Sequence, residues 1–121
     1  MKMMLALDAL AALAQETRLR VFRLLVQEGP GGLSAGEIAT KLKLAPATLT
    51  FHAAQLRHAG LVTSKREGRN ILYRANFDSM NALMTYLTEN CCQGEDCGVP
   101  AACGPANEPL PAKSAKRRRN A

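Results

Sequence analysis

The sequence predicts a mainly α-helical domain that carries a single β-hairpin. Apolar residues recur at helical spacing through most of residues 3–92, and one pair of short β-prone runs around a polar turn at Gly68 interrupts them. The 121 residues fit one small domain. Hydrophobic residues make up 47% of the chain and aromatic residues only 4%, a Leu- and Ala-rich composition that suits helix-on-helix packing.

The first predicted helix covers residues 3–14, which are rich in Ala and Leu and contain no helix breaker. Leu5, Leu10 and Leu13 fall near one face, and Leu7 widens that face. Because a helix this apolar must bury most of its surface, we expect a partner subunit to cover part of it. A small domain buries little apolar surface alone, so a dimeric protein is predicted.

The second predicted helix covers residues 16–29, "ETRLRVFRLLVQEG". Four apolar side chains recur on its inner face, and three arginines are expected outside; the apolar set is Leu19, Phe22, Leu25 and Val26, and the arginines are Arg18, Arg20 and Arg23. Gly29 follows the last periodic residue, and the Pro and Gly residues after it end the helix.

Two further helices are predicted close together. Ser34 is a predicted N-cap, and Glu37 stands three positions later at capping-box spacing, so a short helix begins at residue 35. Pro46 suits the first turn of the next helix, which ends at Gly60. A connection of only a few residues between these helices is typical of a helix-turn-helix.

A hairpin and a last helix complete the predicted fold. Residues 61–66 and 71–75 are the β-prone runs that flank the charged turn. Residues 77–92 read as an amphipathic helix that starts near Asp78 or Ser79, and its apolar face holds Met80, Leu83, Met84 and Leu87. A helix-turn-helix followed directly by a basic hairpin predicts a winged helix-turn-helix.

The charge pattern favours an anionic partner. The chain has a formal net charge of +6 and a pI of about 9.5. Residues 34–74 alone hold seven Lys or Arg and two Glu, a net charge of +5. Because neutralisation of phosphates drives sequence-independent affinity for double-stranded DNA, the wing residues Lys65, Arg66 and Arg69 are predicted phosphate contacts.

The helix that begins at Pro46 is the predicted recognition helix. Leu49, Ala53 and Leu56 should pack inward. The other positions near its N-terminal end are small or polar, which lets the helix approach base edges in the major groove. The candidate DNA contacts on it are Ala47, Thr48, Thr50, Phe51, His52 and Gln55.

Two of these residues have a second interpretation. Phe51 either packs against the hairpin or touches a thymine methyl group. His52 is more often structural at such a position, hydrogen-bonding within the helix-turn-helix, than a ligand or a catalyst. Both alternatives remain open at the level of the sequence.

The sequence resembles the ArsR family of metalloregulatory repressors over about residues 5–92. The residues that carry the resemblance are "ETRLRVFRLL", "LSAGEIATKLKLAPATLTFHAAQLRHAGLV" and "SKREGRNILYRAN". It implies a homodimer whose first and last helices form the interface, and operator binding that weakens when an inducer binds. Some members carry a cysteine motif at the start of the helix leading into the helix-turn-helix. The matching stretch here, "LSAGEIAT", has no cysteine.

All four cysteines of the chain stand together in "CCQGEDCGVPAAC", as Cys91, Cys92, Cys97 and Cys103. Thiolates select soft metal centres, and zinc usually takes CxxC pairs or mixed Cys/His sets, neither of which occurs here. Trivalent arsenic, As(III), or antimony, Sb(III), needs three thiolates, which Cys91, Cys92 and one of Cys97 or Cys103 supply. The resemblance implies the same inducer, because a subgroup of arsenite-responsive repressors has cysteines at the end of its last helix. The spacing departs from that subgroup and leaves the third ligand open, with Cys97 favoured.

Several alternatives compete with this interpretation. Cys92 bonded to Cys97 or Cys103 would make a redox switch, and all four thiolates would hold zinc or cadmium. Incidental thiols in a tail are a further possibility, and a metal-buffering protein would have no need of the wing. A thiol enzyme is disfavoured because a helix C-terminus and acidic neighbours such as Glu89 and Glu95 oppose thiolate formation. The sequence therefore predicts a repressor rather than an enzyme, with no organic cofactor.

The remaining expectations concern organisation and location. We expect a DNA-binding and dimerisation domain over residues 1–92 and a flexible Cys-containing tail over residues 93–121 that ends in "KSAKRRRNA". No apolar run approaches the roughly 20 residues of a membrane span. The apolar N-terminal stretch is interrupted by Asp8 and shows no cleavage context, so a cytoplasmic protein is expected.

Overall fold

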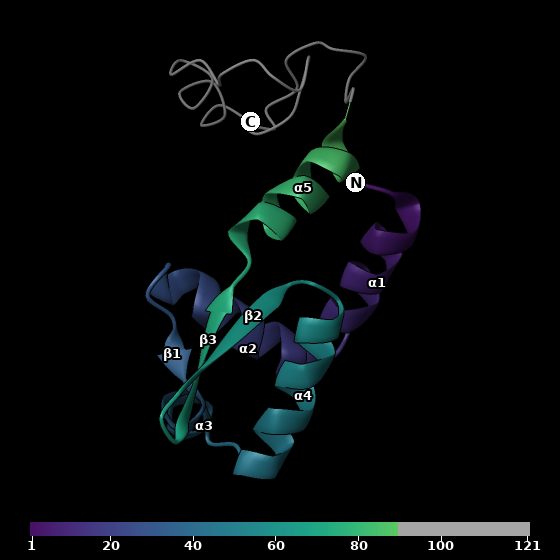
Figure 1. The fold of residues 1–121 in the computed structure, drawn as a ribbon. Coiled ribbons are helices and arrows are strands. Elements are labelled where there is room, and N and C mark those ends of the chain that lie inside the picture. Colours follow the sequence, from purple (N-terminus) through teal and green to yellow (C-terminus); the bar gives the residue numbers. More distant parts are fainter. Residues whose placement is uncertain (90–121) are drawn as a thin grey trace, which may run out of the picture. The chain divides into compact units, whose positions relative to one another are not determined.

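The computed structural model describes residues 1–89, which fold as five helices and one three-stranded sheet (Figure 1). The elements in chain order are α1 (Met3–Leu13), α2 (Glu16–Glu28), β1 (Leu33–Ser34), α3 (Ala35–Leu42), α4 (Pro46–His58), β2 (Val62–Glu67), β3 (Asn70–Ala75) and α5 (Phe77–Thr88). The chain divides into two compact units, Met1–Met80 and a second from Asn81 onward. The first unit contains everything from α1 to the start of α5, and its order of elements confirms the predicted winged helix-turn-helix.

The sheet holds one strand more than the sequence predicts. Strands β2 and β3 form the expected hairpin, and β1 pairs antiparallel with the other edge of β3, giving the order β1-β3-β2. With two residues, β1 is too short to show a period in sequence. Gly32 leads into it with φ of +73°, and a Cβ there would collide with the carbonyl oxygen of Tyr73. Only glycine therefore lets the chain approach β3 this closely.

The core of the first unit is built from α2, α3, α4 and the sheet. Its most deeply buried side chains are Val21, Leu25, Ile38, Leu49, Leu56, Leu61 and Val62. Helix α1 contributes only alanines to this core, namely Ala6, Ala9 and Ala12. Leu5, Leu7 and Leu10 are exposed, so the apolar face predicted for this helix is left open to a partner subunit. Small alanines let α1 lie close to its neighbours, and the leucines point away.

Hydrogen bonds at their ends fix α3 and α4. The predicted capping box is present, since Glu37 N–H donates to Ser34 Oγ at 3.1 Å and Ser34 N–H donates to Glu37 Oε1 at 2.9 Å. These bonds from Ser34 lower the pKa of the Glu37 carboxyl group because they favour its charged form. Pro46 occupies the first turn of α4, as predicted.

The C-terminal end of α4 is a Schellman motif that aims the chain into the hairpin. Gly60 has φ of +81°, its N–H donates to Arg57 C=O at 2.9 Å, and Leu61 N–H donates to Leu56 C=O at 3.0 Å. The two leucines of the motif are fully buried. The first residue of the hairpin region is thus tied to the last turns of α4.

The start of α5 is set by Asn76, where the sequence pointed to Asp78 or Ser79. Asn76 Oδ1 accepts from Ser79 N–H at 3.2 Å, and its Nδ2 donates to Gly60 C=O at 3.0 Å. Helix α5 exposes Met84 and Leu87 and buries Leu83. No helix within residues 1–89 is both long enough and apolar enough to cross a membrane.

Candidate nucleic-acid interface

Helix α4 presents one apolar face to the core and a small, mostly polar face to solvent. Leu49, Ala53 and Leu56 are buried, which confirms the predicted inner face. Five of the six candidate contacts are exposed: Ala47, Thr48, Thr50, Phe51 and Gln55. Because Ala47, Phe51 and Gln55 are spaced by four residues, they form one stripe along the outer face of the helix.

Phe51 is the largest apolar side chain on this outer face. It is 58% exposed, and its ring stands edge-on to the ring of His52 with centroids 5.2 Å apart and planes at 70°. A residue that packed against the hairpin would be covered. The interpretation of Phe51 as a packing residue is therefore not supported, and the ring is available to a partner of α4.

The hydroxyl groups of α4 differ in their surroundings. Thr50 Oγ1 donates to Pro46 C=O at 2.9 Å, so this hydroxyl is used within the helix. Thr48, next to it in sequence, is exposed near the N-terminal end that a recognition helix directs at base pairs. Of the two, Thr48 is the stronger candidate for base readout.

His52 lies at the flank of α4 and is half-buried. Its Nδ1 is 3.4 Å from Nη1 of Arg18, which comes from α2. Burial of the ring, and then the positive charge of Arg18, lower the pKa of His52 from its ordinary value of 6.5. His52 is therefore neutral at neutral pH and is bonded to a helix outside the helix-turn-helix.

The helical period of α2 predicts Arg18 on the outer face, and the structure shows that its side chain is half-buried against other helices. The side chain is half-buried and donates from Nε to Ala12 C=O at 2.7 Å. A helical period marks an arginine as polar, but its long stem lets the charged head reach back to an unpaired carbonyl group. Arg18 is the functional candidate that sequence reasoning missed.

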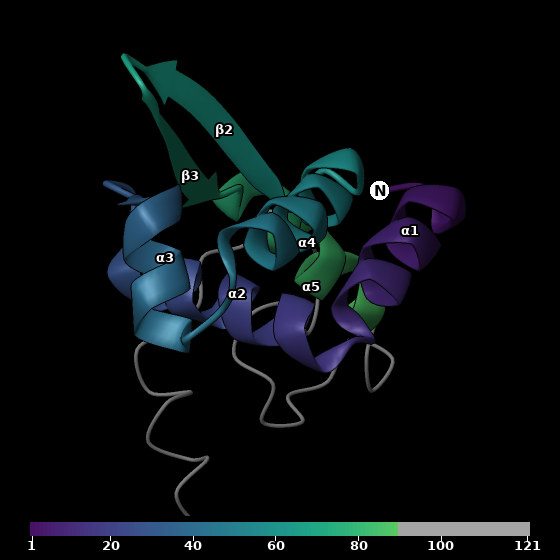
Figure 2. The same ribbon diagram turned by 90° about the horizontal axis from the view of Figure 1, so that it is seen from below.

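The wing carries its charges beyond the helices. Lys65 and Arg66 are exposed on β2, and Arg69 sits in the two-residue turn with Gly68. Figure 2 shows the β2–β3 hairpin extending away from the helices of the first unit. Gly68 has φ of +62°, as tight hairpin turns require. The wing and α4, which is packed against α3 and β2, thus offer a basic and a polar surface on adjacent elements.

The predicted thiol site cannot be placed in this structure. Cys91, Cys92, Cys97 and Cys103 all lie outside the described residues. Within residues 1–89, no group of three or more His, Cys, Asp or Glu side chains is arranged to hold a metal ion.

Helix α4 is the exposed second helix of a helix-turn-helix, and a basic β-wing lies beside it. This combination defines a winged helix-turn-helix DNA-binding protein. Comparison with known proteins agrees, since residues 13–65 match a helix-turn-helix domain family. The transcriptional activator HlyU of Vibrio cholerae is 32% identical over 88 residues, which are 73% of this chain and 79% of HlyU. An ArsR-like transcriptional regulator from Rhodococcus is 32% identical in structure-based alignment, with a TM-score of 0.60 over 69% of this chain and 76% of that one.

This chain therefore belongs to the ArsR-like family of winged helix-turn-helix transcriptional regulators. Another solved member is the homodimeric DNA-binding domain of a Mycobacterium bovis protein, 27% identical, with a TM-score of 0.58 over 69% of this chain and 76% of that one. The matched relatives are regulators of transcription and not enzymes.

Proposed function

We propose that this protein is a homodimeric repressor that leaves its operator when trivalent arsenic or antimony binds its C-terminal cysteines. The observation that carries the DNA-binding part is the exposed polar face of α4 beside a basic wing. The observation that carries the sensing part is the gathering of all four cysteines between residues 91 and 103.

The proposed DNA-binding mode divides the work between two surfaces. Helix α4 enters the major groove, where Thr48, Phe51 and Gln55 meet base edges. The wing lies along the backbone, where Arg66 and Arg69 neutralise phosphates. Thr50 and His52 support the helix from within, because their polar atoms are bonded to Pro46 and Arg18.

A second copy of the chain is the proposed partner of α1. Five large apolar side chains of this helix are exposed: Met3, Met4, Leu5, Leu7 and Leu10. Exposed apolar area of this kind marks an interaction surface. The homodimeric relative from Mycobacterium bovis supports a dimer. Two copies would present two recognition helices to successive major grooves.

The proposed inducer is chosen by ligand chemistry. Cys91, Cys92 and Cys97 supply three soft thiolates for arsenic or antimony, with Cys103 as the alternative third ligand. The arsenic resistance regulator of Pseudomonas putida is 37% identical over 62 residues, 51% of this chain and 47% of that protein, which supports an arsenical inducer. To act as a switch, the ligand must bind the DNA-free state more tightly, with a coupling free energy of about 1–3 kcal/mol.

A gel-shift experiment tests the proposal. The full chain is first used to select a duplex from a random pool, and binding to that duplex is then measured with and without arsenite under reducing conditions. We expect apo protein to bind and arsenite to release it. Cys91→Ser, Cys92→Ser and Cys97→Ser should bind DNA normally and resist release by arsenite. Cys103→Ser should be released almost normally.

The same experiment separates the alternatives. Release by zinc or cadmium but not by arsenite would assign a four-thiolate site, and release by an oxidant that dithiothreitol reverses would assign a redox switch. Normal release by arsenite in both Cys91→Ser and Cys92→Ser would contradict the proposed sensing site and leave the DNA-binding function intact.

A further inference from the structure

Arg18 joins three helices of the first unit through one residue. Its backbone N–H donates to the N-cap side chain of α2, Gln15 Oε1, at 2.8 Å. Its Nε donates to the carbonyl oxygen of Ala12 at 2.7 Å, in the last turn of α1, where helical carbonyl groups lack intrahelical partners. Its Nη1 meets Nδ1 of His52 on α4 at 3.4 Å. The end of α1 and the flank of α4 are thus connected through a single guanidinium.

This contact selects one form of the His52 ring. A guanidinium has donors and no acceptor, so Nδ1 of His52 must be the acceptor, and the proton of the neutral ring sits on Nε2. A protonated ring would place an N–H against the guanidinium and two positive charges about one hydrogen-bond length apart. The contact therefore exists only while His52 is neutral, and the lowered pKa of His52 agrees with this.

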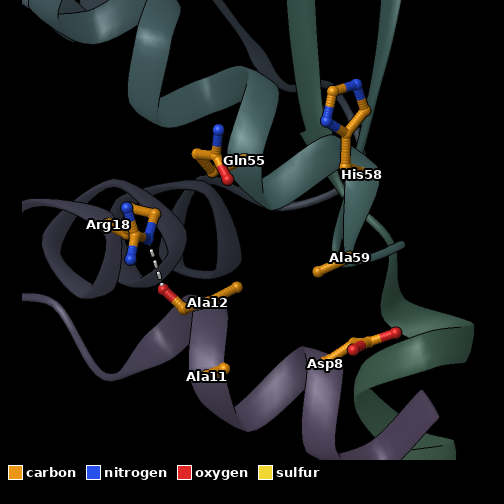
Figure 3. Close-up of a pocket in the computed structure, with 7 residues that line it drawn as sticks. All are labelled: Asp8, Ala11, Ala12, Arg18, Gln55, His58 and Ala59. Carbon is orange, nitrogen blue, oxygen red and sulfur yellow. Dashed lines mark hydrogen bonds between the residues drawn. The ribbon is translucent and has the colours of Figure 1, made fainter. Parts of the chain in front are cut away.

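An open pocket lies beside the guanidinium (Figure 3). Its volume is about 340 Å³, and its lining comes from α1, α2 and the second half of α4: Asp8, Ala11, Ala12, Arg18, Gln55, His58 and Ala59. Three of these residues are alanines, which leave room for a longer side chain to move. The guanidinium has space to leave His52, and the carboxylate of Asp8 lines the space it would enter.

We propose that Arg18 is a positioning residue for the recognition helix, holding α4 to the end of α1 through neutral His52 and releasing it when His52 is protonated. The inference rests on the proposed DNA-binding mode, in which α4 reads base pairs. Sequence-selective binding then requires the Arg18–His52 contact. Binding to phosphates by the wing does not.

Of the charged groups on α4 and on the elements packed against it, Arg18 is the one whose charge affects His52. Several elements pack against α4 within residues 1–89. Helix α1 contributes Asp8, and α2 contributes Glu16, Arg18, Arg20, Arg23 and Glu28. Helix α3 contributes Glu37 and Lys41, with Lys43 as its C-cap residue, and β2 contributes Lys65, Arg66 and Glu67. Helix α4 itself carries Arg57 and His58. Among them, Arg18 is the charge that perturbs the pKa of His52.

The sign of the pH effect follows from the protonation states. Above about pH 6.5 the ring is neutral, the contact is intact and α4 is held in place. As the pH falls through the lowered pKa of His52, the contact is lost. Protonation also adds a positive charge near DNA, which strengthens binding to every duplex alike. The ratio of affinities for a selected and a random duplex removes that shared contribution and reports the position of α4.

The test measures this ratio with the full chain at about pH 7.5 and at a pH below the titration midpoint of His52 measured in the same protein. The two probes are a duplex selected by the wild-type protein and a random-sequence duplex of equal length. We expect the wild-type ratio to fall at least about five-fold on acidification. His52→Gln offers an amide oxygen that accepts from Arg18 without titrating, so its ratio should stay high at both pH values.

Two further variants complete the design. His58→Gln is the matched control, because His58 lines the same pocket from the same helix and should leave the pH response unchanged. Arg18→Met keeps the stem but donates no hydrogen bond, so its ratio should be low at both pH values while its affinity for the random duplex is kept. A wild-type ratio that does not change, or an equal fall in His52→Gln, overturns the proposal.

A measurement without DNA separates this proposal from the proposed function. The chain has two histidines, so the His58→Gln variant assigns the imidazole signals of His52 in a nuclear magnetic resonance titration. We expect the Nε2–H tautomer at neutral pH and a titration midpoint that rises toward the ordinary value in Arg18→Met. An Nδ1–H tautomer, or a midpoint that Arg18→Met leaves unchanged, would show that the Arg18–His52 contact is not formed, whatever the protein does with DNA.

Discussion

Arg18 and Leu19 are neighbours in α2 that take opposite surroundings from those their types suggest. Arg18 is half-buried and bonded to two other helices, whereas Leu19 is 42% exposed. Helical periodicity places a side chain on a face but does not say what stands opposite that face. Here the carbonyl group of Ala12 and the ring of His52 face Arg18, and each accepts a hydrogen bond from its guanidinium. A single residue thus acquires a role from groups far away in sequence.

Phe51 supports a prediction at this scale. Because Phe51 is 58% exposed, we expect Phe51→Ala to change the free energy of unfolding by no more than about 0.5 kcal/mol. Binding to a selected duplex should weaken, while binding to a random duplex should not. Urea unfolding and fluorescence anisotropy measure the two quantities. A loss of about 3–5 kcal/mol in stability, as for a buried Phe, would instead restore the packing interpretation.

Arg69 and Gln55 form a contrasting pair on the two proposed surfaces. Arg69→Ala should weaken binding to all duplexes and reduce the slope of log affinity against log salt by about one. Gln55→Ala should leave that slope unchanged and alter the preference at one base pair by about 1–3 kcal/mol. Anisotropy titrations at several salt concentrations, on selected and single-substituted duplexes, give both values. Identical behaviour of the two variants would remove the division between wing and recognition helix.

At the scale of elements, the end of α4 decides how the wing is attached. The Schellman motif at Gly60 turns the chain from the helix into β2, and Asn76 bonds the carbonyl of that glycine to the start of α5. The glycine is needed for its positive φ and not for lack of room, since a Cβ there would come no nearer than 3.9 Å to Ser79 Oγ. The geometry of the wing therefore depends on one backbone conformation.

Two glycine substitutions test this dependence. Gly60→Ala should destabilise the protein by about 1 kcal/mol, because L residues are strained at φ of +81°. Gly36→Ala is the control: Gly36 lies in the first turn of α3 with open space around it, so alanine should stabilise by about 0.5 kcal/mol. Chemical denaturation of both variants provides the comparison. Equal effects of the same sign would mean that the conformation of Gly60 does not matter.

At the scale of the whole molecule, α1 has a surface that the rest of the first unit does not cover. Three of its alanines, Ala6, Ala9 and Ala12, face the core, and its exposed large side chains are Met3, Met4, Leu5, Leu7 and Leu10. A chain that kept this face in water would expose contiguous apolar area, which favours association. In the proposed dimer, Arg18 also ties the end of this same helix to α4. Dimerisation and DNA binding would thus share one structural connection.

Leu7 provides the prediction at this scale, because it is 54% exposed on the outward face of α1. We expect the wild-type protein to sediment as a dimer at micromolar concentration and Leu7→Glu to sediment as a folded monomer of 13.0 kDa. Because Leu7→Glu loses the dimer, its affinity for a duplex with two half-sites should be lower than that of the wild-type protein. Gln27→Glu, which adds the same charge at an exposed position of α2, is the control and should remain dimeric. A wild-type monomer under these conditions would contradict the dimer.

Much of the fold could be predicted because its signals are local. The capping box at Ser34, the proline that starts α4 and the hairpin around Gly68 each depend on residues a few positions apart, and all three are present. The strand at residues 33–34 escaped prediction because its only signal is its pairing with Tyr73 and Leu72, which lie 40 and 38 residues after their partners. The outer face of α4 followed from its period, which is also local.

The amino-acid sequence alone predicted the five helices and the β2–β3 hairpin in their order, the basic balance of the chain and the gathering of all four cysteines between residues 91 and 103. These properties depend on composition and on short-range spacing, and neither depends on tertiary contacts. The three-dimensional fold was needed to show that α1 turns its alanines inward, that Phe51 is exposed and that Arg18 connects Ala12 with His52. Each of these depends on which elements pack against one another, and the spacing of residues along a helix does not specify which element packs against each of its faces.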